Sequence, residues 1–262
     1  MDLLVFGPHP DDLEIGLGGT IARHAAQGHR VGLCDLTAGE MGSNGTIEER
    51  LTEAEEARGV LGAVWRTNLR WPDRGIGRDA DHVRGAARLI RQARPRAVAL
   101  PYWSDRHPDH GAASTVLTDA VFNSGLRRYE ADAEPWRPVW TVYYFINDAA
   151  SPSFVVDVSE HYQRKRDALA CHRSQFTGAT ANAVDTRLTS PLFLQLVESR
   201  DAQFGAQAGV QFAEGFIVRE PIVRENLFKG AGGMEPRVME AARRGAAFAK
   251  ASAPRAGGPA DT

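Results

Sequence analysis

Two short polar clusters follow apolar runs in this sequence. The stretch GPHPDDLEIGLGGT, residues 7–20, places a histidine, two aspartates and a glutamate within six residues, directly after the apolar run 3–6. A second cluster, SDRHPDHG at residues 104–111, follows the apolar run 97–102. Such a concentration of charge beside buried strands points to a site that does chemistry.

Both clusters offer the ligand atoms of a catalytic zinc ion. Zinc binds imidazole nitrogen and carboxylate oxygen, and a catalytic site usually has three protein ligands and one position for water. His9, Asp12 and His110 would form such a set. The cation would also offset the repulsion between Asp11 and Asp12, which otherwise raises one carboxylate pKa. Each cluster alone has an alternative interpretation as a turn with a capping aspartate, but the pair of them favours one divalent metal per chain.

The elements that must position these residues alternate between short β-rich runs and longer helical segments, which is typical of parallel strands joined by crossover helices. We predict an α/β, doubly wound, Rossmann-like fold: a mostly parallel sheet with helices on both faces. In such a sheet the ligand crevice lies outside the carboxyl ends of the strands, where the strand order reverses. The predicted strands are 3–6, 29–36, 63–69, 97–102, 139–145 and 154–158, and the predicted helices are 15–27, 46–61, 79–93, 112–122 and 160–171.

Length and composition set limits on the class of protein. The chain has 262 residues, 43% of them hydrophobic, and a net charge of -2, which suits one large core. We expect one α/β domain over 1–229, then a Gly-rich hinge, a short helix and a flexible tail over 230–262. Without a basic stripe, neither nucleic acid nor a membrane surface is expected as a partner. The two cysteines, the lack of a long apolar run and an N-terminal stretch without the cationic region of a signal peptide predict a soluble, cytoplasmic protein.

A metal-free nucleotide-binding Rossmann module is the alternative from another class. Gly16, Gly18 and Gly19 suggest a dinucleotide loop, with Asp35 where a ribose-binding acid would stand. Ile21 occupies the place of the third glycine, however, and acidic residues lie where a pyrophosphate needs backbone donors. We expect these glycines instead to let a helix pack closely against the sheet.

The segment PHPDDLEIGLGGT, with RHPDH downstream, resembles the LmbE-like, or PIG-L, family of zinc-dependent N-acetylglucosamine deacetylases, and in particular its bacillithiol branch. Similarity in LTAGEMGSNGTIEERLTEAEEA, SFVVDVSEHYQRKRDALACHRSQF and FAEGFIVREPI extends the resemblance from about residue 3 to residue 222. It implies zinc bound by His9, Asp12 and His110, with Arg50 as a substrate-binding residue. It also implies a homo-oligomer, either a tetramer or a hexamer.

The resemblance further implies Asp11 as general base, His107 as the group that polarises or protonates the amide, and Asp109 as the residue that orients His107. The residue types agree. Bound zinc lowers the pKa of water from about 16 to about 7, Asp11 can move the proton to the leaving amine, and His107 with zinc can stabilise the oxyanion. For Asp109, capping of the next helix is the alternative role. Relatives in the mycothiol branch carry a tyrosine at the position of Asp105, and no tyrosine follows Tyr162 in this sequence, so His107 with zinc is expected to serve the oxyanion without a tyrosine late in the chain.

The resemblance implies N-acetylglucosaminyl malate as the small-molecule substrate, deacetylated in bacillithiol biosynthesis. Arg106 adjoins His107 and Arg50 begins a helix beside the crevice, so two guanidinium groups could meet an anionic or hydroxyl-rich aglycone. Neutralisation of Asp105 or Asp109 is the alternative role for Arg106. Another N-acetylglucosaminide, of mycothiol type or a chitooligosaccharide, is the alternative substrate.

Overall fold

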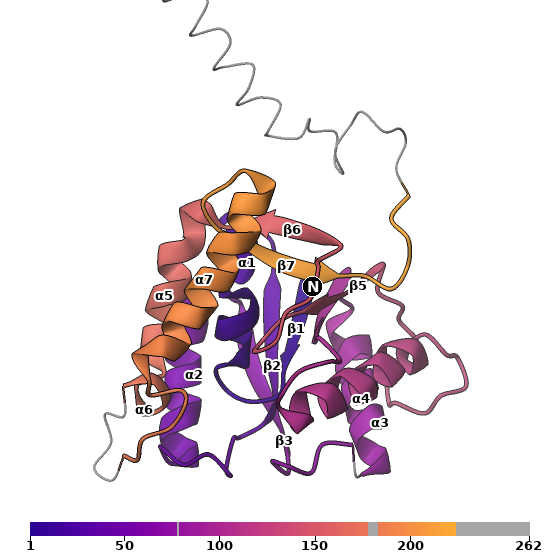
Figure 1. Cartoon of the computed structure of the whole chain (residues 1–262). Coiled ribbons are helices and arrows are strands. Elements are labelled where there is room, and N and C mark those ends of the chain that lie inside the picture. Colours follow the sequence, from indigo (N-terminus) through magenta and orange to yellow (C-terminus); the bar gives the residue numbers. More distant parts are fainter. Residues whose placement is uncertain (78, 178–182, 224–262) are drawn as a thin grey trace, which may run out of the picture. The chain divides into compact units, whose positions relative to one another are not determined.

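The computed structural model describes residues 1–77, 79–177 and 183–223. Residues Met1–Arg219 form one compact unit, a sheet with helices on both faces (Figure 1). This confirms the predicted α/β fold. The hinge, short helix and tail expected over 230–262 lie outside the described residues.

The sheet is mostly parallel. Within the described residues it has seven strands in the order β3-β2-β1-β4-β5-β7-β6. The first five are parallel to their neighbours, whereas β7 runs antiparallel to both β5 and β6. The strands are β1 (Leu3–Gly7), β2 (Val31–Thr37), β3 (Trp65–Trp71), β4 (Ala97–Pro101), β5 (Trp140–Tyr144), β6 (Phe154–Asp157) and β7 (Ala213–Ile217).

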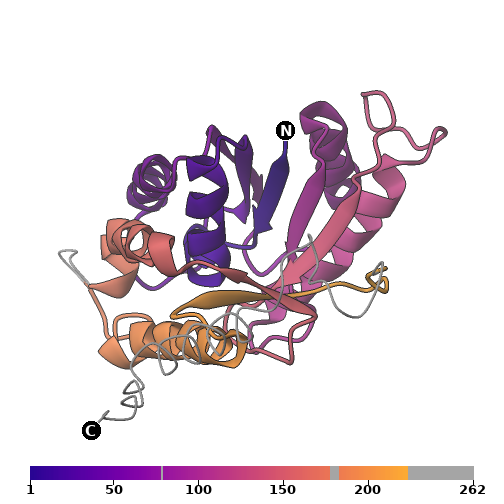
Figure 2. The same ribbon diagram turned by 90° about the horizontal axis from the view of Figure 1, so that it is seen from above.

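The helices cover the sheet in two groups. Figures 1 and 2 show α1, α2, α5 and α7 on one side of the strands and α3 and α4 on the other. Successive side chains of a strand point to opposite faces, so Leu3 and Val5 of β1 enter the first core, and Leu4 and Phe6 enter the second. The helices are α1 (Asp12–Ala26), α2 (Ile47–Leu61), α3 (Ala80–Ala93), α4 (Pro108–Ser124), α5 (Tyr162–Cys171), α6 (Arg173–Phe176) and α7 (Pro191–Ala208).

The strand order reverses between β1 and β4, because β2 and β3 lie on one side of this pair and β5, β7 and β6 on the other. Ligands of open α/β sheets bind at this point, outside the carboxyl ends of the strands. The two polar clusters follow β1 and β4, so the structure brings them to the place that the sequence predicts.

Helix α1 packs closely against its surroundings through its glycines. A Cβ atom at Gly16 would lie 2.3 Å from the ring of Tyr144, and one at Gly19 would lie 2.8 Å from Val158. Asp35 is buried and accepts two hydrogen bonds from Arg66, at 2.7 and 2.8 Å. The glycines therefore serve close packing, as expected, and Asp35 is not available to a ribose.

A kink interrupts α1 at Leu17, which has non-helical φ and ψ angles of -148° and 28°. The backbone N–H groups of Gly19 and Thr20, freed by the kink, donate to the carboxylate of Glu214 on β7 at 3.0 and 2.6 Å. The ammonium group of Lys165 on α5 in turn donates to Glu214 and to Asp201, at 2.7 and 2.6 Å. The last strand of the unit thus supplies the hydrogen-bond acceptor for the kink in the helix that begins at the first polar cluster.

Three elements escape the sequence prediction: the short helix α6, the helix α7 and the strand β7. Helix α7 buries Phe193 and Val197, but Leu192 and Leu196 on the same helix are 71% and 45% exposed. Its apolar residues therefore form no single stripe of helical period. No helix in the described part of the chain is long and apolar enough to cross a membrane.

Candidate metal centre and active site

The start of α4 places three residues of the second cluster. Pro108 occupies the first turn, where a missing N–H costs nothing. His107 caps the helix, because its Nδ1 accepts the backbone N–H of Asp109 at 3.2 Å. The helix thus starts four residues earlier than predicted, and His107 rather than Asp109 is its capping residue.

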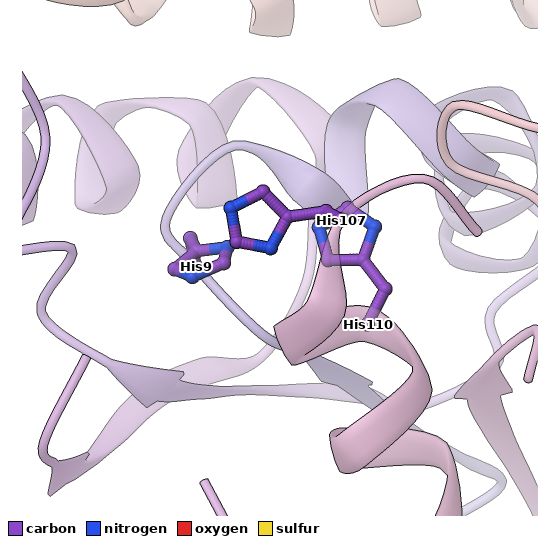
Figure 3. A group of neighbouring side chains, drawn as sticks. All are labelled: His9, His107 and His110. Carbon is purple, nitrogen blue, oxygen red and sulfur yellow. The ribbon is translucent and has the colours of Figure 1, made fainter. Parts of the chain in front are cut away.

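Three imidazole rings converge where the two clusters meet (Figure 3). The ring centroid of His107 lies 4.9 Å from that of His9 and 4.8 Å from that of His110. The centroids of His9 and His110 are 5.7 Å apart. One nitrogen of each ring lies within 4.8 Å of one nitrogen of the others. His9 comes from the loop after β1, and the other two from the loop after β4 and the first turn of α4.

Asp12 lies between two of these rings. Its Oδ2 atom is 3.0 Å from Nδ1 of His9 and 3.3 Å from Nε2 of His110, and all three side chains are buried. Although burial favours the neutral acid, the charge of His110 and hydrogen bonds from both histidines hold the pKa of Asp12 well below its usual range. The carboxylate is therefore ionised and faces two imidazole nitrogens, as the predicted ligand set requires.

The donor set fits a zinc ion because the outer nitrogen of each candidate histidine ligand also faces a carboxylate. Nε2 of His9 lies 3.3 Å from Asp73 and 3.4 Å from Asp109, and Nδ1 of His110 lies 3.0 Å from Asp105. Histidines that bind metals almost always donate the other ring N–H to such a group, which fixes the tautomer. Two imidazoles and one carboxylate are a typical catalytic zinc set.

Asp73 is a member of the site that sequence reasoning missed. It follows β3 in the segment WPDRG, and its Oδ2 also accepts the backbone N–H of Met41 at 3.0 Å. With His9 and Asp109 it forms a second group of potential ligand atoms within 4.8 Å of one another. That group shares His9 with the first.

Asp11 is buried beside the candidate ligands and has a strained backbone. Its φ of 136° lies in a region that non-glycine residues rarely adopt. Burial raises its pKa to about 6, aided by the charge of Asp12 and opposed by Arg50, whose Nη2 lies 3.4 Å away. A general base works best when its pKa is near the operating pH, so this carboxylate suits proton transfer near neutrality.

Arg50 is buried, although it lines the cavity above Asp11. Its guanidinium group donates to the carbonyl oxygens of Gly39 and Pro10, at 2.7 and 3.2 Å. Helix α2, which carries it, begins with a capping box between Thr46 and Glu49. Arg50 therefore ties the loop after β2 to the loop after β1.

The structure relates Asp109 to His107 through the backbone. The Asp109 N–H donates to Nδ1 of His107, so a neutral imidazole carries its hydrogen on Nε2. Burial, together with the charges of His9 and His110, lowers the pKa of His107 and keeps that neutral form. The Asp109 carboxylate itself lies against His9 and accepts the backbone N–H of Arg74 at 2.9 Å.

A cavity of about 480 Å³ opens above these residues. This volume falls within the range of typical small-molecule sites. Asp11, His107 and the side chains of Arg106 and Arg187 line it. No local sequence pattern around Arg187 predicts that it lines the cavity.

Buried histidines and carboxylates lie together at the switch point of the α/β sheet, an arrangement that suits a metal-dependent hydrolase. The sequence also matches the profile of the GlcNAc-PI de-N-acetylase (PIG-L) family over residues 4–121. It is 30% identical to the diacetylchitobiose deacetylase of Thermococcus kodakarensis, over 66% of this chain and 70% of that protein. It is 28% identical to the 1D-myo-inositol 2-acetamido-2-deoxy-alpha-D-glucopyranoside deacetylase of Rhodococcus jostii, over 88% and 98%.

Among solved structures, a conserved protein from Thermus thermophilus superposes with a TM-score of 0.79 at 38% identity, covering 88% of this chain and all of that one. The chain therefore belongs to the PIG-L family. It is an enzyme, a metal-dependent de-N-acetylase that hydrolyses an amide bond.

Proposed function

We propose that this protein is a zinc-dependent deacetylase that releases acetate from an N-acetylglucosaminide. One observation carries the proposal: the ionised carboxylate of Asp12 lies between Nδ1 of His9 and Nε2 of His110. The buried carboxylate of Asp11 is its neighbour in the chain. The relatives are named as deacetylases of N-acetylglucosamine derivatives, which supports the same substrate class.

In this proposal His9, Asp12 and His110 would hold the zinc ion, which when bound would polarise the amide carbonyl and acidify water. Asp11, with a pKa of about 6, takes the proton from the attacking water and later delivers it to the leaving amine. His107 presents its Nε2–H, which makes no hydrogen bond to the described part of the chain, to the developing oxyanion. Arg50 keeps Asp11 in place.

Two observations bear on the aglycone. The named relatives act on a chitobiose derivative and an inositol glycoside, so they favour the alternative substrates over N-acetylglucosaminyl malate. The cavity, in contrast, is lined by four arginines, and two of them, Arg106 and Arg187, have no carboxylate at ion-pair distance within the described residues. Asp109 pairs with Arg74 and Asp105 with His110, so neutralisation of these acids by Arg106 is not observed. Guanidinium groups without a carboxylate partner favour an aglycone that carries a carboxylate.

Acetate release from a panel of glycosides tests both the deacetylase activity and the identity of the aglycone. The panel contains N-acetylglucosamine, its malyl and inositol glycosides, and diacetylchitobiose. Turnover of any of them that disappears on chelation and returns with zinc supports the deacetylase; no turnover of the whole panel contradicts it. A preference for the malyl glycoside in kcat/KM that shrinks in Arg106→Ala and Arg187→Ala identifies the aglycone, whereas a preference for the inositol glycoside or diacetylchitobiose rejects the malyl assignment.

A homo-oligomer, tetramer or hexamer, is also part of the proposal. The family resemblance supports it, together with the exposed leucines of α7, because large apolar side chains gathered on a surface often mark a protein interface. Light scattering on the purified protein measures the subunit count, and a monomer at micromolar concentration contradicts the proposal.

A further inference from the structure

The carboxylate of Asp105 is held in place by four hydrogen bonds. Its two oxygens accept the backbone N–H groups of His107, Asn147 and Asp148, at 2.9, 2.8 and 3.2 Å, and the side-chain amide of Asn147 at 3.0 Å. These donors come from two segments, the loop after β4 and the loop after β5. No arginine or lysine of the described chain lies within ion-pair distance of Asp105.

This fixed charge faces the outer nitrogen of one candidate metal ligand. Oδ1 of Asp105 is 3.0 Å from Nδ1 of His110, and the two side chains are only 2% and 3% exposed. In the observed geometry that nitrogen makes no hydrogen bond to any group of the described chain, although Asp105 lies within reach of it. On the opposite side of the ring, Nε2 lies 3.3 Å from Asp12. The imidazole of His110 is thus placed between the ligand carboxylate and a second, non-ligand carboxylate.

We infer that Asp105 is a positioning residue for the metal: it holds the hydrogen of His110 on Nδ1 and so directs the lone pair of Nε2 toward the ion. A carboxylate in this place also makes the imidazole a stronger donor, and loss of such a partner typically weakens metal binding about 10–100-fold. The inference rests on the proposed function, because it presumes a metal held by His9, Asp12 and His110.

The same carboxylate connects the metal ligand to the mouth of the cavity. The amide of Asn147 donates from Nδ2 to Asp105, and its Oδ1 accepts a hydrogen bond from Arg187 at 3.1 Å. Both contacts agree with one orientation of the amide group. Asp105 therefore fixes a ligand of the metal on one side and, through Asn147, a substrate-facing guanidinium group on the other.

The test compares Asp105→Asn with Asp148→Asn. Both remove one negative charge from the same region, but the Asp148 side chain is exposed and makes no contact with His110. The zinc dissociation constant of each metal-free protein is measured by competition with a chelating dye. We expect about 10–100-fold weaker binding in Asp105→Asn, and less than about a twofold change in Asp148→Asn. Unchanged affinity in Asp105→Asn, or equal losses in both variants, overturns the inference.

Two further measurements keep the inference testable and separate from the proposed function. The ¹⁵N spectrum of the histidines in the zinc-loaded wild type reports the tautomer of His110 without any substitution. A hydrogen on Nδ1 supports the inference, and a hydrogen on Nε2 overturns it even if Asp105→Asn fails to fold. If wild-type protein binds no zinc at all, the proposed function fails; if it binds zinc tightly and Asp105→Asn binds it equally well, only this inference fails.

Discussion

The carboxylate of Asp11 lies 3.4 Å from the guanidinium group of Arg50, in a setting that otherwise disfavours its charge. Burial and the neighbouring Asp12 raise its pKa to about 6, and the backbone at Asp11 has a φ of 136°. Both features cost stability at neutral pH, and both belong to a residue that lines the cavity beside the candidate metal site. Strain of this kind gathers at functional sites because the surrounding structure enforces it.

Asp11→Asn should lose turnover by about 10²–10⁴-fold and keep its metal, because the proposed base lies outside the ligand set. Single-turnover acetate release and elemental analysis of the same sample measure the two quantities. His110→Ala is the matched control and should lose both. If Asp11→Asn loses the metal, the roles of Asp11 and Asp12 are interchanged.

The same variant should stabilise the metal-free protein in a pH-dependent way. A carboxyl whose pKa rises from 3.8 to about 6 on folding contributes stability at low pH that is lost as the pH rises through 6. Asparagine stays neutral, so Asp11→Asn should gain on the order of 2–3 kcal/mol over wild type above pH 7. Urea unfolding at pH 4 and pH 8 should show the gain only at the higher pH. A gain of equal size at both values would assign the effect to packing.

Asp11→Gly should be more stable than Asp11→Asn at the same pH. Glycine adopts a φ of 136° without strain, and relief of one such conformation is worth about 1–3 kcal/mol. Thermal unfolding of the two metal-free variants side by side isolates the backbone contribution, because both lack the charge. Equal midpoints would show that the backbone relaxes in solution.

The purified protein should contain one tightly bound divalent metal per chain, although two groups of ligand atoms include His9. A neutral imidazole has one nitrogen with a lone pair, and the other carries hydrogen. His9 can therefore bind a metal ion together with Asp12 and His110, or together with Asp73 and Asp109, but it cannot bind two ions at once. Elemental analysis after dialysis measures the ratio, and two retained equivalents would contradict the assignment.

Lys165→Met should destabilise the fold by about 3–5 kcal/mol, because it leaves Asp201 and Glu214 as buried charges without their shared partner. All three side chains are 0% exposed. Urea unfolding gives the change in free energy. The exposed ion pair of Arg166 with Glu198 is the control, and Arg166→Met should cost less than about 1 kcal/mol. Similar losses of unfolding free energy in the two variants would mean that burial adds nothing to the contribution of the Lys165 ion pairs.

The part of the site that could be predicted from the sequence is the part carried by short local motifs. Each motif directly follows a strand, and adjacent parallel strands bring their carboxyl ends together, so His9, Asp12 and His110 could be assembled without a structure. Asp73, Arg74 and Arg187 lie in loops without a recognisable spacing. Their place depends on how far each loop folds back over the sheet.

The fold shows the same division. Strands and helices with one clear period were predicted, with boundaries displaced by up to four residues. Strand β7 was missed, and its place between β5 and β6 could not follow from local pattern, since strands distant in sequence decide it. The helix α7 was missed because its apolar residues occupy two faces.

The kink of α1 at Leu17 has a consequence for synthesis of the protein. The helix that carries Asp12 is completed by Glu214, which emerges from the ribosome almost two hundred residues later. A nascent chain that already contains both polar clusters therefore lacks the acceptor for two backbone N–H groups in the helix beneath them. We expect ribosome-bound chains that stop before residue 213 to bind metal weakly, with tight binding acquired only as the last strand is added.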